Sequence, residues 1–506
     1  MSGAAAIPGK KRKPLLSRIP TGFVQAVLKG HSGLGIAFAA VIYIVCLSGT
    51  LAVFYDEFLR WENPDAPRVE AVSPEAVQTA LEQAVQQAGE GVEHVYLTMP
   101  DKDRPYLRVS VDAAQESDWI ADGAGDLVAP MRDAWSEFIL GLHIYLHLPA
   151  TWGIFVVGMT GVALLSSLIS GILAHPRILR DAFHLRIGGS QRLQEADLHN
   201  RIGVWGLPFH IVISLTGAFL GLVTVTVGVL GLVMFDGDTD RIYDLFLAQE
   251  PAENPAPAPL LDLAPMFAQL PDAGRIDRIT LEHPTEQGGA ALFDFRNDAA
   301  LAETASYAFD RGGLYYAKGA EDFTFGETVL GSMGPLHFGW FSGGVIKIAY
   351  GILGLGVTYL AVGGIKIWLA RRRDKGRPAP GWERVWAAVV WGQPLGLAAA
   401  ALAALAAPAA GQGLLIGVWG GVALAALALA AALPAAAIGR WGKMLSGAAL
   451  IVLGLWHAAG HGGLAGPALV WIVDLALLAA GALLCGLALG GMRSARQRTV
   501  APQGHP

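Results

Sequence analysis

Four histidines occur at related positions in the two halves of the chain, each at the expected start of a membrane helix; they are His31, His143, His199 and His337. In each half, the first histidine lies 17 residues before a hydroxyl residue that is followed by glycine, at Ser48-Gly49 and at Thr216-Gly217. A neutral imidazole is the commonest protein ligand for metal ions and binds the iron of a porphyrin axially. The spacing therefore predicts a tandem repeat that supplies four candidate metal ligands.

Two further histidines lie close to these four. His210 follows His199 by 11 residues, which on a straight helix places it about 16 Å deeper and about 20° round the axis. An ionisable side chain at that depth is a candidate for function, so we expect His210 to bind the same group as His199 or to form a hydrogen bond beside it. His147 lies one turn beyond His143 and is an alternative ligand to it. The sequence leaves both alternatives open.

The composition is typical of a membrane protein. Hydrophobic residues make up 53% of the 506 residues, charged residues only 15%, and the mean hydropathy is +0.45. A helix needs roughly 20 apolar residues to cross a bilayer. We predict eight such spans, near residues 33–55, 152–174, 202–235, 338–370, 385–407, 414–437, 445–459 and 464–489. The lipid bilayer is thus the expected surrounding, and no feature of the charge pattern favours binding to nucleic acid.

Basic residues predict the orientation of these spans, because short cytoplasmic loops carry an excess of Lys and Arg. Such residues cluster in the N-terminal tail, after the second, fourth and sixth spans, and at the C-terminal end. The pattern predicts that both termini are cytoplasmic and that two longer polar segments lie outside. Cys46 and Cys485 both fall within apolar spans, so neither is expected in an extracellular disulfide.

The two long polar segments share one order of predicted elements. In residues 61–131, a helix near 76–88 precedes strands near 92–98 and 106–111 and a strand, glycine turn and strand over 118–128. In residues 251–317, a helix near 261–270 precedes strands near 276–282, 291–295, 305–310 and 314–317. Each segment is therefore predicted to form a small α+β module, and the common order supports an internal duplication.

The repeat divides the chain into ten segments. They are a basic cytoplasmic tail (1–28), a first span (29–60), a first module (61–135), a second span (136–175), a cytoplasmic loop (176–198), a third span (199–236), a second module (237–333), a fourth span (334–373), a C-terminal membrane region of four helices (374–492) and a cytoplasmic tail (493–506).

The C-terminal four helices carry few residues with candidate chemistry. His457 and His461 lie one turn apart, as in a metal-binding pair or in a wet, glycine-rich loop. Asp474 lies within the last span, where we expect it to serve a proton path or to reach the water outside.

This layout resembles the PepSY-associated transmembrane family, whose members resemble iron-regulated inner-membrane proteins and siderophore reductases. The residues that carry the resemblance are Gly30-His31-Ser-Gly-Leu-Gly, Leu142-His143, Leu198-His199-Asn-Arg-Ile-Gly-Val-Trp, Leu336-His337-Phe-Gly and the two modules, over roughly residues 29–373. The resemblance implies a mainly α, polytopic protein of the bacterial inner membrane. It also implies a four-helix haem-binding core, two PepSY-like periplasmic modules and extra C-terminal spans.

The resemblance further implies two b-type haems bound by pairs of histidines. His31 and His199 hold equivalent repeat positions and are expected to bind one haem near the cytoplasmic face. His143 and His337 are expected to bind the other near the periplasmic face. His210 is a further candidate contact to the cofactor on the His199 side. Lys347 is expected to neutralise a haem propionate or to extend to the lipid headgroups.

The expected function is electron transfer across the membrane to a ferric siderophore in the periplasm, which releases iron as the more weakly held ferrous ion. The sequence contains no Gly-x-Gly-x-x-Gly after a strand and no phosphate loop. An external donor is therefore expected, either a quinol or a cytoplasmic reductase. Two alternatives remain: a siderophore or iron transporter component that uses the C-terminal spans, and a periplasmic interaction or protease-regulating protein that acts through its PepSY-like modules.

Overall fold

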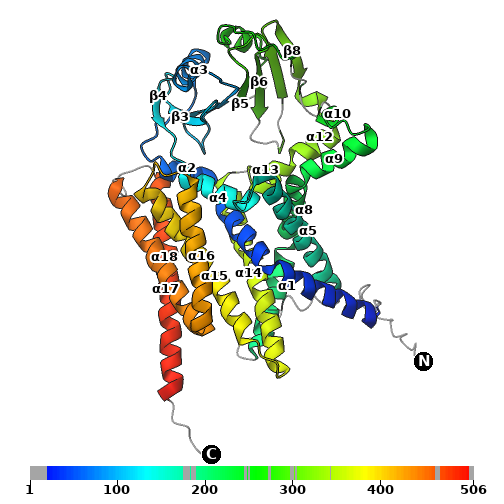
Figure 1. Cartoon of the computed structure of the whole chain (residues 1–506), viewed down its shortest axis with the longest axis vertical. Helices are drawn as coiled ribbons and strands as arrows, with labels where there is room; N and C mark the ends of the chain where they lie inside the picture. Colours follow the sequence, from blue (N-terminus) through cyan, green and yellow to red (C-terminus); the bar gives the residue numbers. More distant parts are fainter. Residues whose placement is uncertain are drawn as a thin grey trace, which may run out of the picture.

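The computed structural model describes residues 20–174, 183, 190–243, 248, 251–271, 275–296, 301–302, 305–341, 343–461 and 468–500. Long helices form one block, and a β-sheet lies at one end of it (Figure 1). The first helix begins, and the last helix ends, on the side of the block away from the sheet (Figure 1). The predicted fold class, a mainly α polytopic membrane protein with a small sheet region, is confirmed.

Seven helices in the described part of the chain are long and apolar enough to cross a membrane. They are α1 (Thr21–Ala52), α5 (Ala150–Ala174), α14 (Gly344–Asp374), α15 (Pro380–Ala406), α16 (Gln412–Ala432), α17 (Ala435–Gly460) and α18 (Ala468–Val500). An eighth span results if the bent pair α7 (Gln191–Trp205) and α8 (Leu207–Gly221) is counted as one.

The third predicted span is not straight, so the expectation of one continuous helix over 202–235 is wrong. Helices α7 and α8 meet at 71° around Gly206, and a third helix, α9 (Val223–Met234), follows them. Pro208 lies in the first turn of α8 and has no N–H to continue the hydrogen bonds of α7. Proline beside glycine is a common cause of such a kink.

Four spans of the repeat form the core of the membrane region. Helix α1 packs against α5 and α14, α5 packs against α8, and α14 packs against α7. Small residues bring α5 and α8 together, because a Cβ atom added to Gly158 would lie 2.7 Å from the backbone of Gly221. Only small residues let two helix backbones approach this closely.

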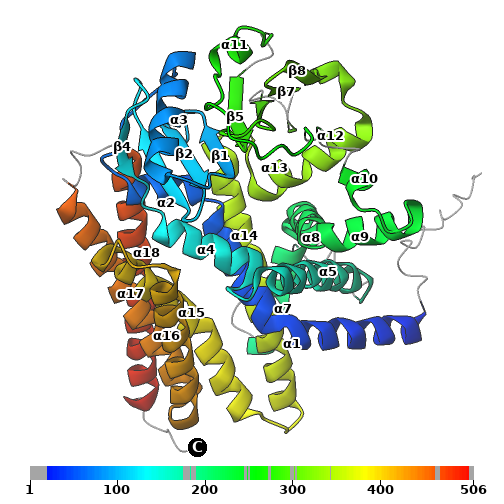
Figure 2. The same cartoon turned by 45° about the horizontal axis from the view of Figure 1, so that its top comes forward.

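Short helices lie between the spans and the sheet (Figures 1 and 2). They are α2 (Tyr55–Glu62), α4 (Ala134–Tyr145), α12 (Phe325–Gly331) and α13 (Met333–Phe338). The predicted second and fourth spans, 136–175 and 334–373, are therefore divided. Leu146 ends α4 in a left-handed conformation, and Gly339 does the same for α13. His143 and His337 lie near the ends of these short helices, and not at the start of membrane spans as expected.

The strands of both modules form one antiparallel sheet of eight strands in the order β4-β3-β2-β1-β5-β6-β7-β8. The strands are β1 (His94–Thr98), β2 (Leu107–Asp112), β3 (Ser117–Ala121), β4 (Leu127–Pro130), β5 (Arg275–Glu282), β6 (Ala290–Arg296), β7 (Ala305–Asp310) and β8 (Gly313–Lys318). The modules meet where β1 pairs with β5, with Tyr96 opposite Thr280 at the centre. This pairing satisfies two strand edges that separate modules would leave exposed.

One hydrophobic core serves both modules. Helix α3 (Pro74–Ala88) and the four-residue helix α11 (Ala264–Phe267) contribute to it, so the second predicted helix, 261–270, is much shorter than expected. The alternating burial of β2 matches the predicted half-buried strand, because its inward residues alternate with partly exposed ones.

Candidate functional site

The structure brings His143 and His337 together. Their ring centroids lie 6.0 Å apart, and the ring planes differ by 17°. Nδ1 of His143 lies 2.9 Å from the carbonyl oxygen of Val45, and Nδ1 of His337 lies 2.9 Å from Oγ1 of Thr216. The Val45 carbonyl can only accept, so Nδ1 of His143 carries the proton and Nε2 keeps its lone pair.

His337 is held in the same tautomer. The Thr216 hydroxyl donates to the carbonyl oxygen of Val212 at 2.7 Å, which leaves it to accept from Nδ1 of His337. Hydrogen bonds of this kind orient metal-binding histidines and fix the nitrogen that binds. Both rings therefore present an unprotonated Nε2.

Glycines on neighbouring helices make room for both rings. A Cβ atom added to Gly49 would lie 2.5 Å from Cε1 of His143, and one added to Gly217 would lie 2.7 Å from Cε1 of His337. Real Cβ atoms essentially never come this close, so a side chain at either position would displace the ring. In each Ser/Thr-Gly pair of the sequence repeat, the glycine is thus the residue against which a histidine ring packs.

The rings line an apolar cavity between α1, α4, α5, α8, α13 and α14. Two imidazoles that bind one metal ion at about 2 Å from each nitrogen place their ring centroids about 5 to 6 Å apart, depending on the angle at the metal. The 6.0 Å separation of His143 and His337 matches this geometry. Two imidazoles beside apolar walls are a donor set that is compatible with a haem.

His31 and His199 have a related setting in the other part of the core. Nδ1 of His31 lies 3.0 Å from the carbonyl oxygen of Ser167, and its ring lies against Gly171, where an added Cβ would be 3.4 Å from Cε1. The His199 ring lies against Gly363, whose added Cβ would be 3.5 Å from Nδ1. All four histidines thus lie against a glycine of a helix in their own half of the chain. The pairing of His31 with His199 stays a prediction.

His210 is fully buried at the bend between α7 and α8. Its Nε2 would lie 2.5 Å from a Cβ added to Gly206. The 71° bend overturns the expectation that His210 faces the same way as His199 on one straight helix. Neither ring nitrogen of His210 has a hydrogen-bond partner among the described residues. A role for His210 beside a cofactor stays a prediction.

His147 is held away from the pair. Its Nε2 lies 2.9 Å from the carbonyl oxygen of Phe138, and its ring stacks on the Phe138 ring at 4.7 Å. Of the two alternatives, His143 on α4 is therefore the one that faces His337, and His147 lies beyond the end of that helix.

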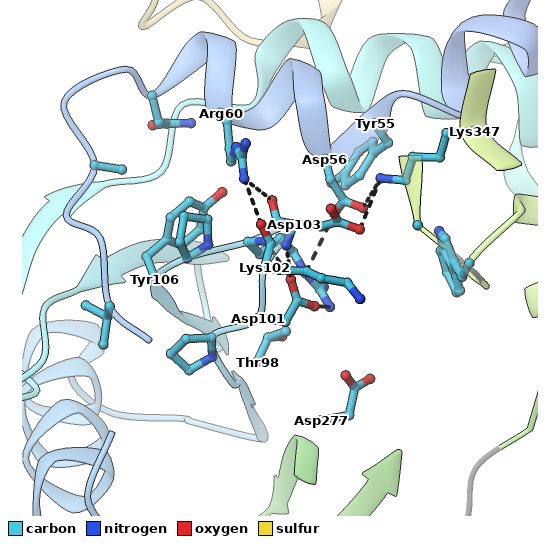
Figure 3. A pocket seen from close by; sticks show the side chains of 18 of the residues that line it. Tyr55, Asp56, Arg60, Thr98, Asp101, Lys102, Asp103, Tyr106, Asp277 and Lys347 are labelled. Atoms are coloured by element: carbon cyan, nitrogen blue, oxygen red, sulfur yellow. Dashed lines mark hydrogen bonds and ion pairs between the residues drawn. The ribbon is translucent and has the colours of Figure 1, made fainter. Parts of the chain in front are cut away.

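A second, larger cavity of about 1040 Å³ lies between the sheet and the spans. Figure 3 shows Tyr55, Asp56 and Arg60 entering it from α2, with Asp277 opposite them on β5. Ala52, Ile144 and Phe338 line both this cavity and the one that holds His143 and His337. We call it the sheet-side cavity; it adjoins the histidine pair.

Charged side chains are abundant around the sheet-side cavity, with eight cationic groups and five carboxylates. They are Arg60, Arg68, Lys102, Arg104, Arg275, Arg278, Arg296 and Lys347, and Asp56, Glu70, Asp101, Asp103 and Asp277. Glu57 and Asp294, outside the lining, contact Lys347 and Arg278. Arg60 donates to the backbone carbonyls of Lys102 and Asp103 and, in the described part of the chain, contacts no carboxylate. Cationic groups therefore outnumber carboxylates in and beside the cavity.

Lys347 does not match its expected role. Its buried Nζ lies 3.0 Å from Glu57, 3.4 Å from Asp56 and 3.6 Å from Asp103. Burial raises the pKa of the Glu57 carboxyl, and the Lys347 ammonium opposes that change. The Lys347 ammonium is therefore paired with carboxylates of α2. It does not extend to the lipid headgroups and is not free to neutralise a haem propionate.

A buried polar cluster joins α2 to the C-terminal helices. Nε1 of Trp61 donates to Oδ1 of Asp474 at 2.8 Å, and Nδ1 of His457 lies 3.0 Å from the same oxygen. Nε2 of His457 lies 2.8 Å from the carbonyl oxygen of Trp61. All three residues are at most 3% exposed. His457 is therefore not in a wet loop, and Asp474 does not reach the water outside.

Comparison with known proteins gives one family and one relative. Residues 28–371 match the family described as the PepSY-associated TM region. This stretch contains all four histidines of the repeat and both modules, and the helices α15–α18 lie outside it. An uncharacterized protein of Pseudomonas aeruginosa is 29% identical over 405 residues, which cover 73% of this chain and 97% of that protein.

Proposed function

Because the chain belongs to the PepSY-associated transmembrane family, we propose that it is a di-haem electron-transfer protein that reduces a ferric siderophore at the periplasmic face of the inner membrane. The proposal rests on the pair His143 and His337, whose ring centroids lie 6.0 Å apart and which adjoins the sheet-side cavity. The proposal makes the chain an oxidoreductase.

In this proposal, His143 and His337 hold one b-type haem and His31 and His199 hold the other. When bound, haem supplies one-electron transfer at a potential that its ligands and surroundings adjust. Val45 and Thr216 orient the two outer imidazoles through their Nδ1 atoms. Such outer contacts also make a bound imidazole more basic.

The sheet-side cavity is the proposed docking place for the ferric complex. Its volume of about 1040 Å³ is slightly above the range of about 300–1,000 Å³ for small-molecule sites. Arg60 and its cationic neighbours favour a chelate that carries negative charge. One electron converts Fe³⁺ to Fe²⁺, and the oxygen ligands of the siderophore hold the ferrous ion more weakly.

The arrangement of the chain supports the proposed orientation. Helix α14 ends in Arg371, Arg372 and Arg373, on the side away from the sheet (Figure 1). Basic residues next to a span favour the cytoplasm. The sheet and its cavity would then face the periplasm, and electrons would enter from a quinol or a cytoplasmic reductase near His31 and His199.

The experiment is an anaerobic reoxidation assay on the purified full-length protein. We expect about two haems per chain by pyridine haemochrome. The dithionite-reduced protein should be reoxidised by a ferric siderophore, with ferrous iron trapped by ferrozine in step with loss of the reduced spectrum. An anionic ferric complex should react faster than a neutral hydroxamate complex.

Two results would contradict the proposal. A protein without a Soret band, after expression with adequate haem supply, removes the electron-transfer function and favours a PepSY-mediated interaction role. Haems that stay reduced with several ferric siderophores but reoxidise with a quinone would identify a quinone-linked cytochrome in place of a siderophore reductase.

A further inference from the structure

A cluster of histidines and carboxylates lies where the two modules join, at the end of the sheet away from the sheet-side cavity. His94 begins β1, and Thr98 at the other end of β1 lines the cavity. Four residues of strand separate them by about 13 Å. The cluster is therefore separate from the proposed electron-transfer site.

Three side chains of the first module converge there. One ligand atom from each of Glu93, His94 and Asp112 lies within 4.8 Å of the other two. Asp112 lies directly opposite His94 in the pairing of β1 with β2, and Nδ1 of His94 lies 3.5 Å from Oδ2 of Asp112. The sheet register thus fixes an imidazole and a carboxylate side by side.

The second module supplies another imidazole. The rings of His94 and His283 lie 6.0 Å apart between centroids, with their planes tilted by 46°. The backbone N–H of His283 donates to the carbonyl oxygen of Glu93 at 2.7 Å, so the two chain segments are tied together. His283 has a φ of 43°, in the left-handed region that non-glycine residues seldom adopt.

Both imidazoles carry a ring nitrogen without a hydrogen-bond partner. Nδ1 of His94 and Nδ1 of His283 are enclosed and make no hydrogen bond within the described part of the chain. Their nearest acidic oxygens, on Asp112 and Glu286, lie at 3.5 and 3.7 Å. These distances are too long for strong hydrogen bonds, and they leave space for an ion between imidazole and carboxylate.

We propose that Glu93, His94 and Asp112 bind one divalent transition-metal ion at the junction of the two modules, and that the neighbouring His283 ring turns to bind the same ion. Two imidazoles and one or two carboxylates form a donor set that suits Zn²⁺, Cu²⁺, Ni²⁺ or Fe²⁺ better than Ca²⁺ or Mg²⁺. The ring centroids of His94 and His283 lie 6.0 Å apart, so a rotation of the His283 side chain brings one of its nitrogens to the ion. The ion links the halves of the sheet.

The test uses the full-length protein in detergent, purified without a polyhistidine tag and treated with a chelator. Zn²⁺ is titrated by calorimetry, and bound Cu²⁺ is examined by electron paramagnetic resonance. We expect one Zn²⁺ per chain at this site, Cu²⁺ hyperfine structure from two nitrogens, and a higher thermal midpoint with Zn²⁺. His94→Ala, Asp112→Asn and His283→Ala should each weaken Zn²⁺ binding at least tenfold and abolish the thermal shift.

Two variants serve as matched controls. His147→Ala removes an imidazole outside the cluster, and Glu116→Gln removes an exposed carboxylate of the same module; both should bind Zn²⁺ as the parent protein does. Absence of Zn²⁺ binding to the folded parent protein would overturn the proposal, as would unchanged binding in His94→Ala. Unchanged binding in His283→Ala alone would overturn the link between modules. None of these measurements depends on haem or on siderophore reduction.

Discussion

Substitution of Gly49 by alanine is the sharpest test of the outer histidine pair. The added Cβ would lie 2.5 Å from Cε1 of His143, whereas ordinary contacts begin at 3.4 Å. The ring must therefore move by about 0.9 Å, which exceeds the tolerance of about 0.5 Å within which binding groups must be held. On helix propensity alone, the change should stabilise α1 by about 1 kcal/mol. A loss of cofactor would thus not arise from a weaker helix.

Haem content measured by pyridine haemochrome is the readout for Gly49→Ala. We expect about one haem per chain, against about two in the parent protein. Gly22→Ala is the matched control, because it adds a methyl group to the same helix and meets nothing within 4 Å. If Gly49→Ala retains two haems with an unchanged spectrum, the assignment of His143 as a ligand in this cavity is wrong.

Three further predictions concern ligand pairing, topology and pH. His31→Ala should remove the inner haem and spare the outer one, and His337→Ala should do the reverse, as resolved by the remaining spectrum. Alkaline phosphatase fused after Asp126 should be active, and fused after Arg373 inactive; the opposite pattern overturns the orientation. Burial raises the pKa of the Glu62 carboxyl from 4.5 to about 7, so the folded state binds this proton more tightly. The thermal midpoint should therefore fall as pH rises from 4.5 to 7, and Glu62→Gln should remove that dependence.

The sequence predicted local elements well where a pattern has one dominant cause. Strand β7 coincides with the predicted 305–310, and β2 lies within one residue of the predicted 106–111, because alternating apolar residues specify a half-buried strand. Helix α5 lies within two residues of the predicted 152–174. The repeat also predicted that His143 would lie beside His337, and their ring centroids are 6.0 Å apart.

Features that depend on distant partners were not predictable in the same way. The pairing of β1 with β5 joins residues nearly 200 positions apart, and neither strand carries a signal for its neighbour. The ring of His143 packs on Gly49 through a contact between α4 and α1, so the spacing of this glycine was visible in the sequence but its role in packing was not. The bend at Gly206 is different, because Pro208 beside it is a local signal for a kink that the expectation of a straight helix did not take into account.

The C-terminal helices α17 and α18 hold helix α2 in place. Helix α2 is bound on three sides: Trp61 contacts Asp474 of α18, Glu57 contacts Lys347 of α14, and Glu62 accepts from the first N–H groups of α4. A carboxylate at a helix N-terminus satisfies N–H groups that have no partner within the helix. Helix α4 carries His143, and α2 lines the sheet-side cavity. Because α17 and α18 hold α2 in place, they also determine the distance between the proposed docking place and the outer histidine pair.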